Sequence, residues 1–428
     1  MGTVDRIKYL SLQSKSYEDL YDMIWKINKR SEYKKDFSKL KLGLFNIPCN
    51  GFGDIILCNT FYRLLKNWYP LMNITVCSTN PDKFKKLGCC HKITTIHSKH
   101  DYKECLNFDE LIFKAKIKFD MMIVVPLIDK PFHIKTFQKL IPYANIFNTF
   151  AMSEYNGGDP PYTFPIGVGE GQLGLLLNDN ATKQQNLIKG PYALVYIQPS
   201  PQWGIHASYC FFSYLEMICK NYKKYSKFQI IIPEWIKEDI EGNSHFRSKL
   251  REIIKPHFKN CKLIYEKNDE EYLLTNDKSK TLLILRGDIL PQPRNIFISL
   301  IKDSIKDVLL TGDQSITDAI SCCQQKRIWY QIAPWKEGFA YHLHKELPNK
   351  YFKSFHTSCG TLKSINLDIE WKHFKKKYDF RIHGKERMDL LLTGFNILKK
   401  DKKLMNQLVT IIEHSRYLET AQTKIMNL

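Results

Sequence analysis

Two stretches of the sequence alternate short apolar runs with segments of helical periodicity, and this alternation limits the fold more than any other feature. In the first stretch the apolar runs are KLGLFNIP (41–48), NITVCST (73–79) and FDMMIVVPLI (119–128). Both faces of the last run are apolar, as in a strand buried within a parallel sheet. Strands and helices that alternate in this way favour a parallel sheet with right-handed crossovers.

A break between 156 and 190 separates the two stretches. It contains two adjacent prolines and the segment FPIGVGEGQLGLLL, a composition typical of a junction between domains. We therefore predict an α/β fold of two Rossmann-like domains facing each other, with helical N- and C-terminal extensions. The expected ranges are 1–40 for a helical extension, 41–185 and 186–365 for the two domains, and 366–428 for a helical, basic tail.

The charge of the chain is strongly positive, with 64 Lys and Arg against 44 Asp and Glu and a formal net charge of +20. Such a charge suits anionic partners, including nucleoside diphosphates, nucleic acid and anionic lipid. The basic residues are spread along the chain without a nucleic-acid-binding motif, so nucleic acid is not the favoured partner and a solvated lysine-rich surface is the plainer interpretation.

The sequence predicts a cytoplasmic protein. No apolar run reaches the roughly 18 to 20 residues of a membrane span, and the N-terminus has no signal-peptide core. This leaves peripheral contact as the one membrane association to consider. The 12 cysteines include no CxxC pair and no Cys/His quartet with zinc spacing, so we expect reduced, mostly buried thiols and no metal site.

The first candidate site is the loop CNGFGDIIL (49–57), which follows the first apolar run. Gly51 and Gly53 allow a ligand to approach the backbone, and the start of a helix supplies N–H groups. Asp54 stands where that helix begins, so its carboxylate can cap the helix or project from the carboxyl edge of the sheet. The loop lacks the third glycine of a dinucleotide fingerprint, because residue 56 is Ile, and it lacks the Lys-Ser/Thr of a P-loop.

The second candidate site is DVLLTGDQSITDAIS (307–321), in the later stretch. An apolar run ends just before Gly312, which opens a turn, and Ser315 with Asp318 has the spacing of a capping box. The N–H groups at this helix start can hold a diphosphate. Asp313 can bind sugar hydroxyls or help to cap the helix.

Further candidates follow other strand ends in the later stretch. Arg286 follows the run TLLIL and could reach phosphates, and Lys336 follows the last apolar run. Gln198, Ser200 and Trp203 come after the first run of this stretch and could line a ligand site. For each of these residues a surface or packing role is the plainer interpretation.

These two motifs together resemble GT-B glycosyltransferases. NGFGDIILCNTFYRLLKNWYP (50–70) resembles the heptosyltransferase-like group, glycosyltransferase family nine, in which a Gly-Asp pair precedes an apolar helix and the aspartate is taken as the general base. Asp54 is the matching residue. The segment LLTGDQSITDAIS (309–321) resembles the donor-side helix of GT-B enzymes, including protein-arginine rhamnosyltransferases, whose Gly-Asp/Glu-x-Ser turn faces the nucleotide diphosphate. The matching residues are Gly312, Asp313, Gln314 and Ser315. The loop IQPSPQWG lacks the His-Pro-Gly common in these families.

The resemblance implies a metal-independent glycosyltransferase, whose nucleotide-sugar donor is a substrate rather than a cofactor. Asp54 would deprotonate an acceptor substrate (a protein, a glycan or another molecule), while helix N–H groups and basic residues stabilise the leaving diphosphate. The loop facing that acceptor would comprise Asn50, Gly51, Phe52 and Gly53. Two alternatives stay open, because a fold alone does not determine function: a nucleotide-sugar epimerase, and a non-catalytic module that binds nucleic acid or an acidic partner through its charge.

Overall fold

The protein is represented by a computed structural model, which divides into two compact units. The first unit comprises Met1–Leu175 and Tyr378–Leu428, and the second comprises Leu176–Lys377. The structure describes residues 37–49, 52–89, 91–106, 110–112, 119–126, 149–156, 164–178, 187–199, 206–266, 269–276, 279–323, 325–333, 336–347, 349, 352–366 and 371–400. The expected N-terminal helical extension therefore lies almost wholly outside the described residues.

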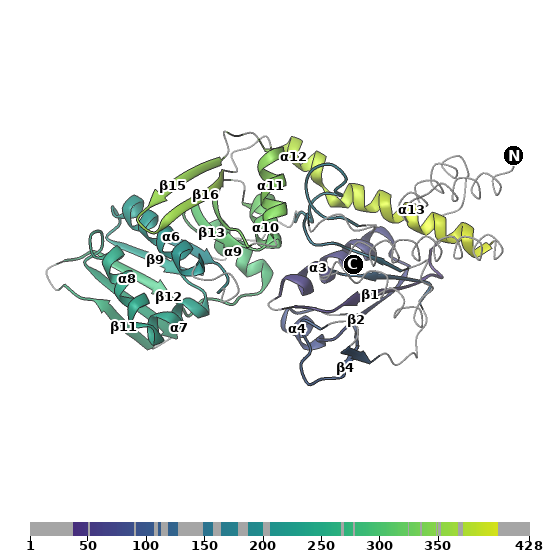
Figure 1. Ribbon diagram of the computed structural model, residues 1–428, viewed down its shortest axis with the longest axis horizontal. Coiled ribbons are helices and arrows are strands. Elements are labelled where there is room, and N and C mark those ends of the chain that lie inside the picture. The colour runs from purple at the N-terminus through teal and green to yellow at the C-terminus, as the bar shows by residue number, and fades with distance from the viewer. Residues whose placement is uncertain are drawn as a thin grey trace, which may run out of the picture. The chain divides into compact units, whose positions relative to one another are not determined.

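A parallel sheet forms the centre of the first unit (Figure 1). Its described strands follow the order β3-β2-β1-β6-β7, and every neighbouring pair is parallel. The strands are β1 (Lys41–Asn46), β2 (Asn73–Ser78), β3 (Ile93–Thr95), β6 (Met121–Val124) and β7 (Thr149–Ala151). Helix α3 (Gly53–Trp68) follows β1 and α4 (Pro81–Lys86) follows β2, and a small hairpin pairs β4 (His97–Ser98) with β5 (Leu111–Ile112).

The C-terminal helix α13 (Phe380–Lys400) belongs to the first unit and packs against α3. The ring of Phe380 is fully buried and contacts Phe61 and Trp68, with centroid distances of 6.0 and 6.3 Å. Further along, the Tyr69 hydroxyl donates to the Asp389 carboxylate at 2.7 Å, and burial raises the pKa of this tyrosine. The apolar face of α3 is thus covered by a segment more than 300 residues later in the chain.

The second unit contains a longer, mixed sheet. Its described strands follow the order β11-β10-β12-β9-β8-β13-β14-β16-β15, parallel from β10 to β14 and antiparallel at both edges. The strands are β8 (Tyr192–Tyr196), β9 (Lys227–Ile231), β10 (Asn260–Glu266), β11 (Asp269–Leu274), β12 (Leu282–Arg286), β13 (Asp307–Thr311), β14 (Arg327–Gln331), β15 (Phe352–Thr357) and β16 (Gly360–Asn366).

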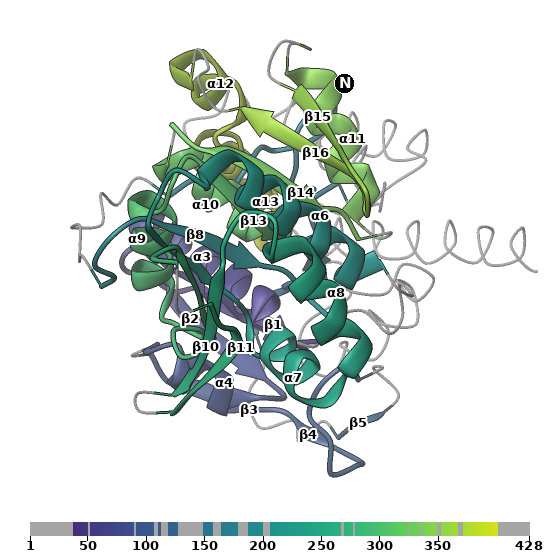
Figure 2. The same cartoon turned by 90° about the vertical axis from the view of Figure 1, so that its left-hand side faces the viewer.

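Helices cover both faces of this sheet. Figure 2 shows α6 (His206–Tyr222), α7 (Glu234–Gly242) and α8 (Ser244–Ile254) on one side, with α9 (Arg294–Asp303) and α10 (Asp313–Cys322) on the other. The alternation of side chains along β8 explains this: Ala193, Val195 and Ile197 pack with α6, whereas the Tyr192 hydroxyl donates to the Leu300 carbonyl of α9 at 2.8 Å. Helices α11 (Glu337–Glu346) and α12 (Trp371–Tyr378) follow later in the chain.

The predicted fold class is confirmed, since both units are α/β with parallel sheets. Contacts divide the chain between Leu175 and Leu176 and assign the chain from Tyr378 onward to the first unit. The sequence-derived boundaries at 40, 185 and 365 stay a prediction. Among the described residues, no helix combines the length and the apolar character that crossing a bilayer requires.

Replacing Phe380 by Ala should destabilise the first unit, because a buried ring that joins α3 to α13 is lost. We expect the free energy of unfolding to fall by about 3 to 5 kcal/mol, measured by chemical denaturation. Ile382→Ala on the same helix is the matched control, since Ile382 is 44% exposed, and it should change stability by less than about 0.5 kcal/mol. Equal effects of the two substitutions would contradict the proposed packing.

Candidate functional site

Both predicted loops lie at the positions where parallel α/β sheets usually bind ligands. In the first unit β1 lies between β2 and β6, and in the second β8 lies between β9 and β13, so the strand order reverses beside each of these strands. Ligands bind outside the carboxyl ends of strands at such reversals. Asp54 follows β1 and the Gly312 turn follows β13, so each unit carries one candidate site at its own reversal point.

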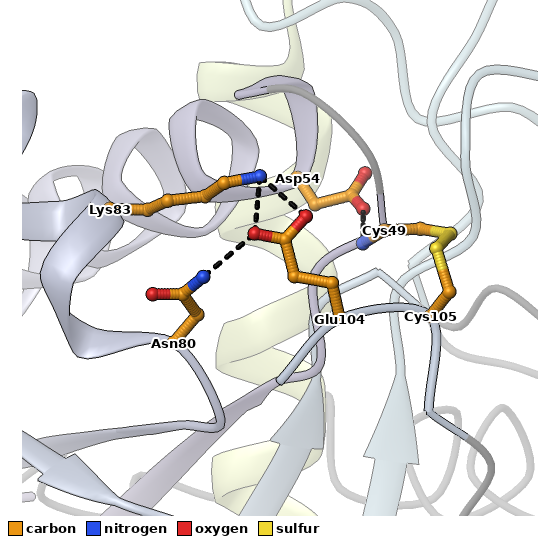
Figure 3. Close-up of a disulfide and its surroundings, with 6 residues drawn as sticks. All are labelled: Cys49, Asp54, Asn80, Lys83, Glu104 and Cys105. Carbon is orange, nitrogen blue, oxygen red and sulfur yellow. Dashed lines mark hydrogen bonds and ion pairs between the residues drawn. A yellow bond between two sulfur atoms is a disulfide. The ribbon is translucent and has the colours of Figure 1, made fainter. Parts of the chain in front are cut away.

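Asp54 is the second residue of α3 and turns back toward the start of its own loop. Its Oδ2 accepts a hydrogen bond of 2.8 Å from the Cys49 backbone N–H (Figure 3). The residue at the N-cap position is Phe52, and no side-chain capping bond is found for α3 within the described residues. Asp54 is therefore not a helix cap, and its carboxylate is oriented by the loop instead. Asn50 and Gly51 lie outside the described residues.

Buried Asn46, at the last position of β1, holds the start of α3 through hydrogen bonds of its side chain. Its side-chain amide donates to the Val125 carbonyl at 2.9 Å and to the Asp54 carbonyl at 3.2 Å. Its side-chain oxygen accepts from the Ser78 hydroxyl at 3.1 Å. This one side chain thus connects the ends of three neighbouring strands and anchors the start of α3. The sequence signal for it was a single polar residue within an otherwise apolar run.

A polar cluster that the sequence did not predict lies beside Asp54. The Glu104 carboxylate accepts from the Asn80 amide at 2.7 Å and from the Lys83 ammonium at 2.6 Å (Figure 3). The same ammonium lies 5.4 Å from the centre of the Phe52 ring, a cation–π distance. Because these residues come from three separate segments, only the folded sheet brings them together, and no spacing in the sequence indicated them.

A disulfide between Cys49 and Cys105 corrects the expectation that all thiols are reduced. The two cysteines are 56 residues apart in the chain, and the Cys105 N–H also donates to the Pro48 carbonyl at 2.9 Å. Cys105 lies in the connection between β4 and β5, and the fold brings this segment beside the loop that follows β1. Buried thiols do occur elsewhere, and burial raises the pKa of Cys77 to about 12.

The Gly312 turn in the second unit is built differently from the predicted capping box. Gly312 has φ of +81°, a conformation that glycine adopts readily, and α10 begins at Asp313. Ser315 is therefore already inside the helix rather than at its cap. Asp318 lies further along α10 and accepts two hydrogen bonds, of 2.8 and 2.6 Å, from the guanidinium of Arg294. The capping box is wrong because the helix starts earlier than the Ser-x-x-Asp spacing indicated.

Two of the predicted donor-site residues, Asp313 and Lys336, form an ion pair at the start of α10. The Lys336 ammonium lies 2.7 Å from Asp313 Oδ2, and the Tyr330 hydroxyl donates to Oδ1 at 3.1 Å. Asp313 is only 4% exposed. Burial, together with the neighbouring carboxylate, raises the pKa of Tyr330 well above its usual value. The pair holds a lysine ammonium beside the N-terminus of a helix, which is a favourable place for an anion.

Gln198 also lies close to the Gly312 turn. Its N–H donates to the Gln331 side chain at 3.0 Å, and the Gln331 amide donates back to the Gln198 carbonyl at 3.2 Å. Thr311, at the end of β13, donates to the Gln331 carbonyl at 3.0 Å. These bonds bring the ends of β8, β13 and β14 together. Gln314, by contrast, is buried and donates to Asp318 at 3.1 Å, and Ser200 and Trp203 lie outside the described residues.

Arg286 is not brought together with the Gly312 turn. Its guanidinium forms two hydrogen bonds of 2.7 Å with Asp288 and one of 3.2 Å with Gln229. Strand β12, which it ends, is separated from β13 by β9 and β8, so the two strand ends are roughly 14 Å apart. Among the described residues, no group of three or more His, Cys, Asp or Glu side chains is arranged to hold a metal ion.

Comparisons with known proteins give distant structural similarities. No protein-family model and no curated protein matches the chain. A glycosyl transferase family 9 structure from Veillonella parvula is similar over 71% of this chain and 84% of that chain, at 12% identity and a TM-score of 0.36. The E. coli heptosyltransferase WaaC, solved with ADP, is similar over 70% and 89%, at 9% identity and a TM-score of 0.33.

A third similar structure is the α,α-trehalose 6-phosphate synthase from Burkholderia multivorans, which matches over 85% of this chain and 76% of that chain at 10% identity and a TM-score of 0.27. Within the described residues, both units of this chain are α/β with parallel sheets.

Replacing Gly312 by Ala should destabilise the second unit, because alanine adopts the positive φ of this position only with strain. We expect a loss of about 1 to 2 kcal/mol in the free energy of unfolding, measured by urea denaturation. Gly53→Ala is the matched control at the other helix start, where no atom lies within 4 Å of an added Cβ, and its stability should stay within about 0.5 kcal/mol of wild type. A destabilisation by Gly53→Ala alone would contradict the two loop conformations.

Proposed function

We propose that the protein is a metal-independent glycosyltransferase that moves a sugar from a nucleotide-sugar donor to an acceptor substrate. The observation that carries this proposal is a pair of complementary helix starts, one in each α/β unit. The start of α10 has Lys336 beside it and suits an anion, whereas the start of α3 presents the carboxylate of Asp54. Both follow a strand next to a reversal of strand order.

The donor half of the proposed reaction relies on the start of α10. Gly312 is the N-cap residue, and no side-chain capping bond is found there within the described residues. The first N–H groups of α10 and the Lys336 ammonium are suited to bind the diphosphate of the donor. As the bond to the sugar breaks, negative charge grows on the leaving diphosphate, and these fixed donors stabilise that charge. Asp313 keeps the long lysine side chain at the helix start.

The acceptor half relies on Asp54. A backbone N–H orients the carboxylate, and an ionised carboxylate can act as a general base. In the proposed step the acceptor O–H or N–H proton passes to Asp54. The acceptor atom bonds to the anomeric carbon, and the bond from that carbon to the diphosphate oxygen breaks. The products are the glycosylated acceptor and a nucleoside diphosphate.

The role of Asp54 is tested with a panel of UDP-, GDP-, ADP- and dTDP-sugars in the presence of a chelator. Asp54→Asn should lower kcat by roughly 10²- to 10⁴-fold, the usual contribution of a general base, with the donor Kd unchanged. Asp82→Asn is the matched control, because Asp82 is a surface aspartate of α4 whose side chain is 58% exposed. Transfer at the wild-type rate by the Asp54→Asn variant would show that this carboxylate is not the base.

The role of Lys336 is tested by calorimetric titration with nucleoside diphosphates, a measurement that needs no acceptor substrate. Lys336→Gln should raise the Kd by about tenfold, which corresponds to 1.4 kcal/mol, because one of the phosphate-binding cations is lost. Lys345→Gln is the control, at an exposed position of α11, the helix that begins directly after Lys336. If the two variants bind the diphosphate equally well, the donor site does not include Lys336.

A further inference from the structure

Cys49 makes two bonds that connect Asp54 to a distant segment. Its backbone N–H donates to Asp54 Oδ2 at 2.8 Å, and its sulfur is bonded to the sulfur of Cys105 (Figure 3). The two cysteines are separated by 56 residues in the sequence. The residue that orients the candidate base is therefore fixed covalently to a second loop at the same sheet edge.

The second loop is itself firmly held. Glu104, the neighbour of Cys105, pairs with Lys83 and Asn80, and the side chains of Lys83 and Glu104 are only 15% and 24% exposed. Helix α4, which carries Lys83, is anchored by the fully buried ring of Phe84. The disulfide thus ties the loop before α3 to a part of the unit that is fixed by an ion pair, an amide hydrogen bond and core packing.

The backbone at Cys105 has an uncommon conformation that its contacts to the other loop help to hold. Cys105 has φ of +53°, a left-handed conformation that residues other than glycine seldom adopt. The bonds that hold it are the disulfide to Cys49 and the hydrogen bond from its N–H to the Pro48 carbonyl at 2.9 Å. Unfavourable backbone conformations persist where the surroundings enforce them. Opening the disulfide removes one of these restraints from both loops.

We infer that the Cys49–Cys105 disulfide and Glu104 are positioning elements for Asp54, so that transfer depends on the oxidation state of this cysteine pair. The inference rests on the proposed function. A dithiol reductant would supply two electrons and two protons. The sulfur–sulfur bond breaks, two thiols form, and the reductant becomes a disulfide. The N–H of Cys49 then loses its fixed place, and the carboxylate of Asp54 loses its orientation.

The experiment compares wild type with the double variant Cys49→Ser/Cys105→Ser, before and after treatment with dithiothreitol. Mass spectrometry of alkylated peptides reports the state of the pair. We expect reduction to lower the wild-type kcat by roughly tenfold or more, since small misplacements of reacting groups are costly, while the donor Kd stays within about twofold. Reoxidation should restore kcat, and the double variant should be slow and insensitive to the reductant. Cys359→Ser, in the second unit, is the matched control and should respond as wild type does.

Hydrogen exchange of the peptide spanning 49–57 gives a reading that does not depend on activity, and it should become faster on reduction. Unchanged exchange, an unchanged kcat in protein whose pair is shown to be open, or an absent disulfide in aerobically purified protein would each overturn the inference. The protein could instead transfer sugar from no donor in either oxidation state while its hydrogen exchange still responds to reduction. That result would count against the proposed function. If the double variant does not fold, the Glu104→Gln variant with its disulfide formed is measured instead. Its kcat should be lower than that of wild type, at an unchanged donor Kd.

Discussion

The strand order of each sheet reverses beside one central parallel strand, β1 in the first unit and β8 in the second, and parallel sheets commonly bind ligands outside the carboxyl ends of such strands. β1 lies between β2 and β6, and β8 lies between β9 and β13. The chain therefore adds strands first on one side of each central strand and later on the other side. A helix starts beside each reversal, α3 after β1 in the first unit and α10 after β13 in the second. The first backbone N–H groups of a helix have no partner within that helix, and no side-chain capping bond is found at either start within the described residues.

The two helix starts differ in the charge that they accommodate. At α10 a buried aspartate holds a lysine ammonium next to the helix N-terminus, and Tyr330 supplies a further hydrogen bond to that aspartate. At α3 the carboxylate of Asp54 takes a hydrogen bond from the loop backbone and leaves the helix cap position to Phe52. The start of α10 is therefore suited to an anion, whereas the start of α3 carries an oriented carboxylate, the base of the proposed transfer. This difference is what a reaction with an anionic leaving group and a proton-bearing acceptor requires.

The parts that follow from local pattern were predictable from the sequence. Short apolar runs and helical periodicity indicated the parallel sheets, and strand–loop–helix order placed Asp54 and Gly312 at helix starts. The ion pair between Asp313 and Lys336 could be anticipated only in part, because both residues follow strands while their contact depends on strand order. The capping box at Ser315 was wrong, since a helix can begin before the residue whose side chain best fits a cap.

The long-range contacts were not predictable. Cys49 with Cys105, and Glu104 with Lys83 and Asn80, are brought together by loops that follow different strands. Their residue types occur throughout a chain rich in lysine and asparagine, so composition gave no signal for them. For Arg286, a place at the end of a strand suggested a ligand contact, and the structure adds that Asp288 and Gln229 hold its guanidinium.

The account is tested most directly by a crystal structure of the protein with a nucleoside diphosphate bound. We predict that the phosphates lie within hydrogen-bonding distance of the first N–H groups of α10 and of the Lys336 ammonium, next to Gly312. Phosphates bound instead at the loop before α3, beside Asp54, would contradict the assignment of donor and base to the two units.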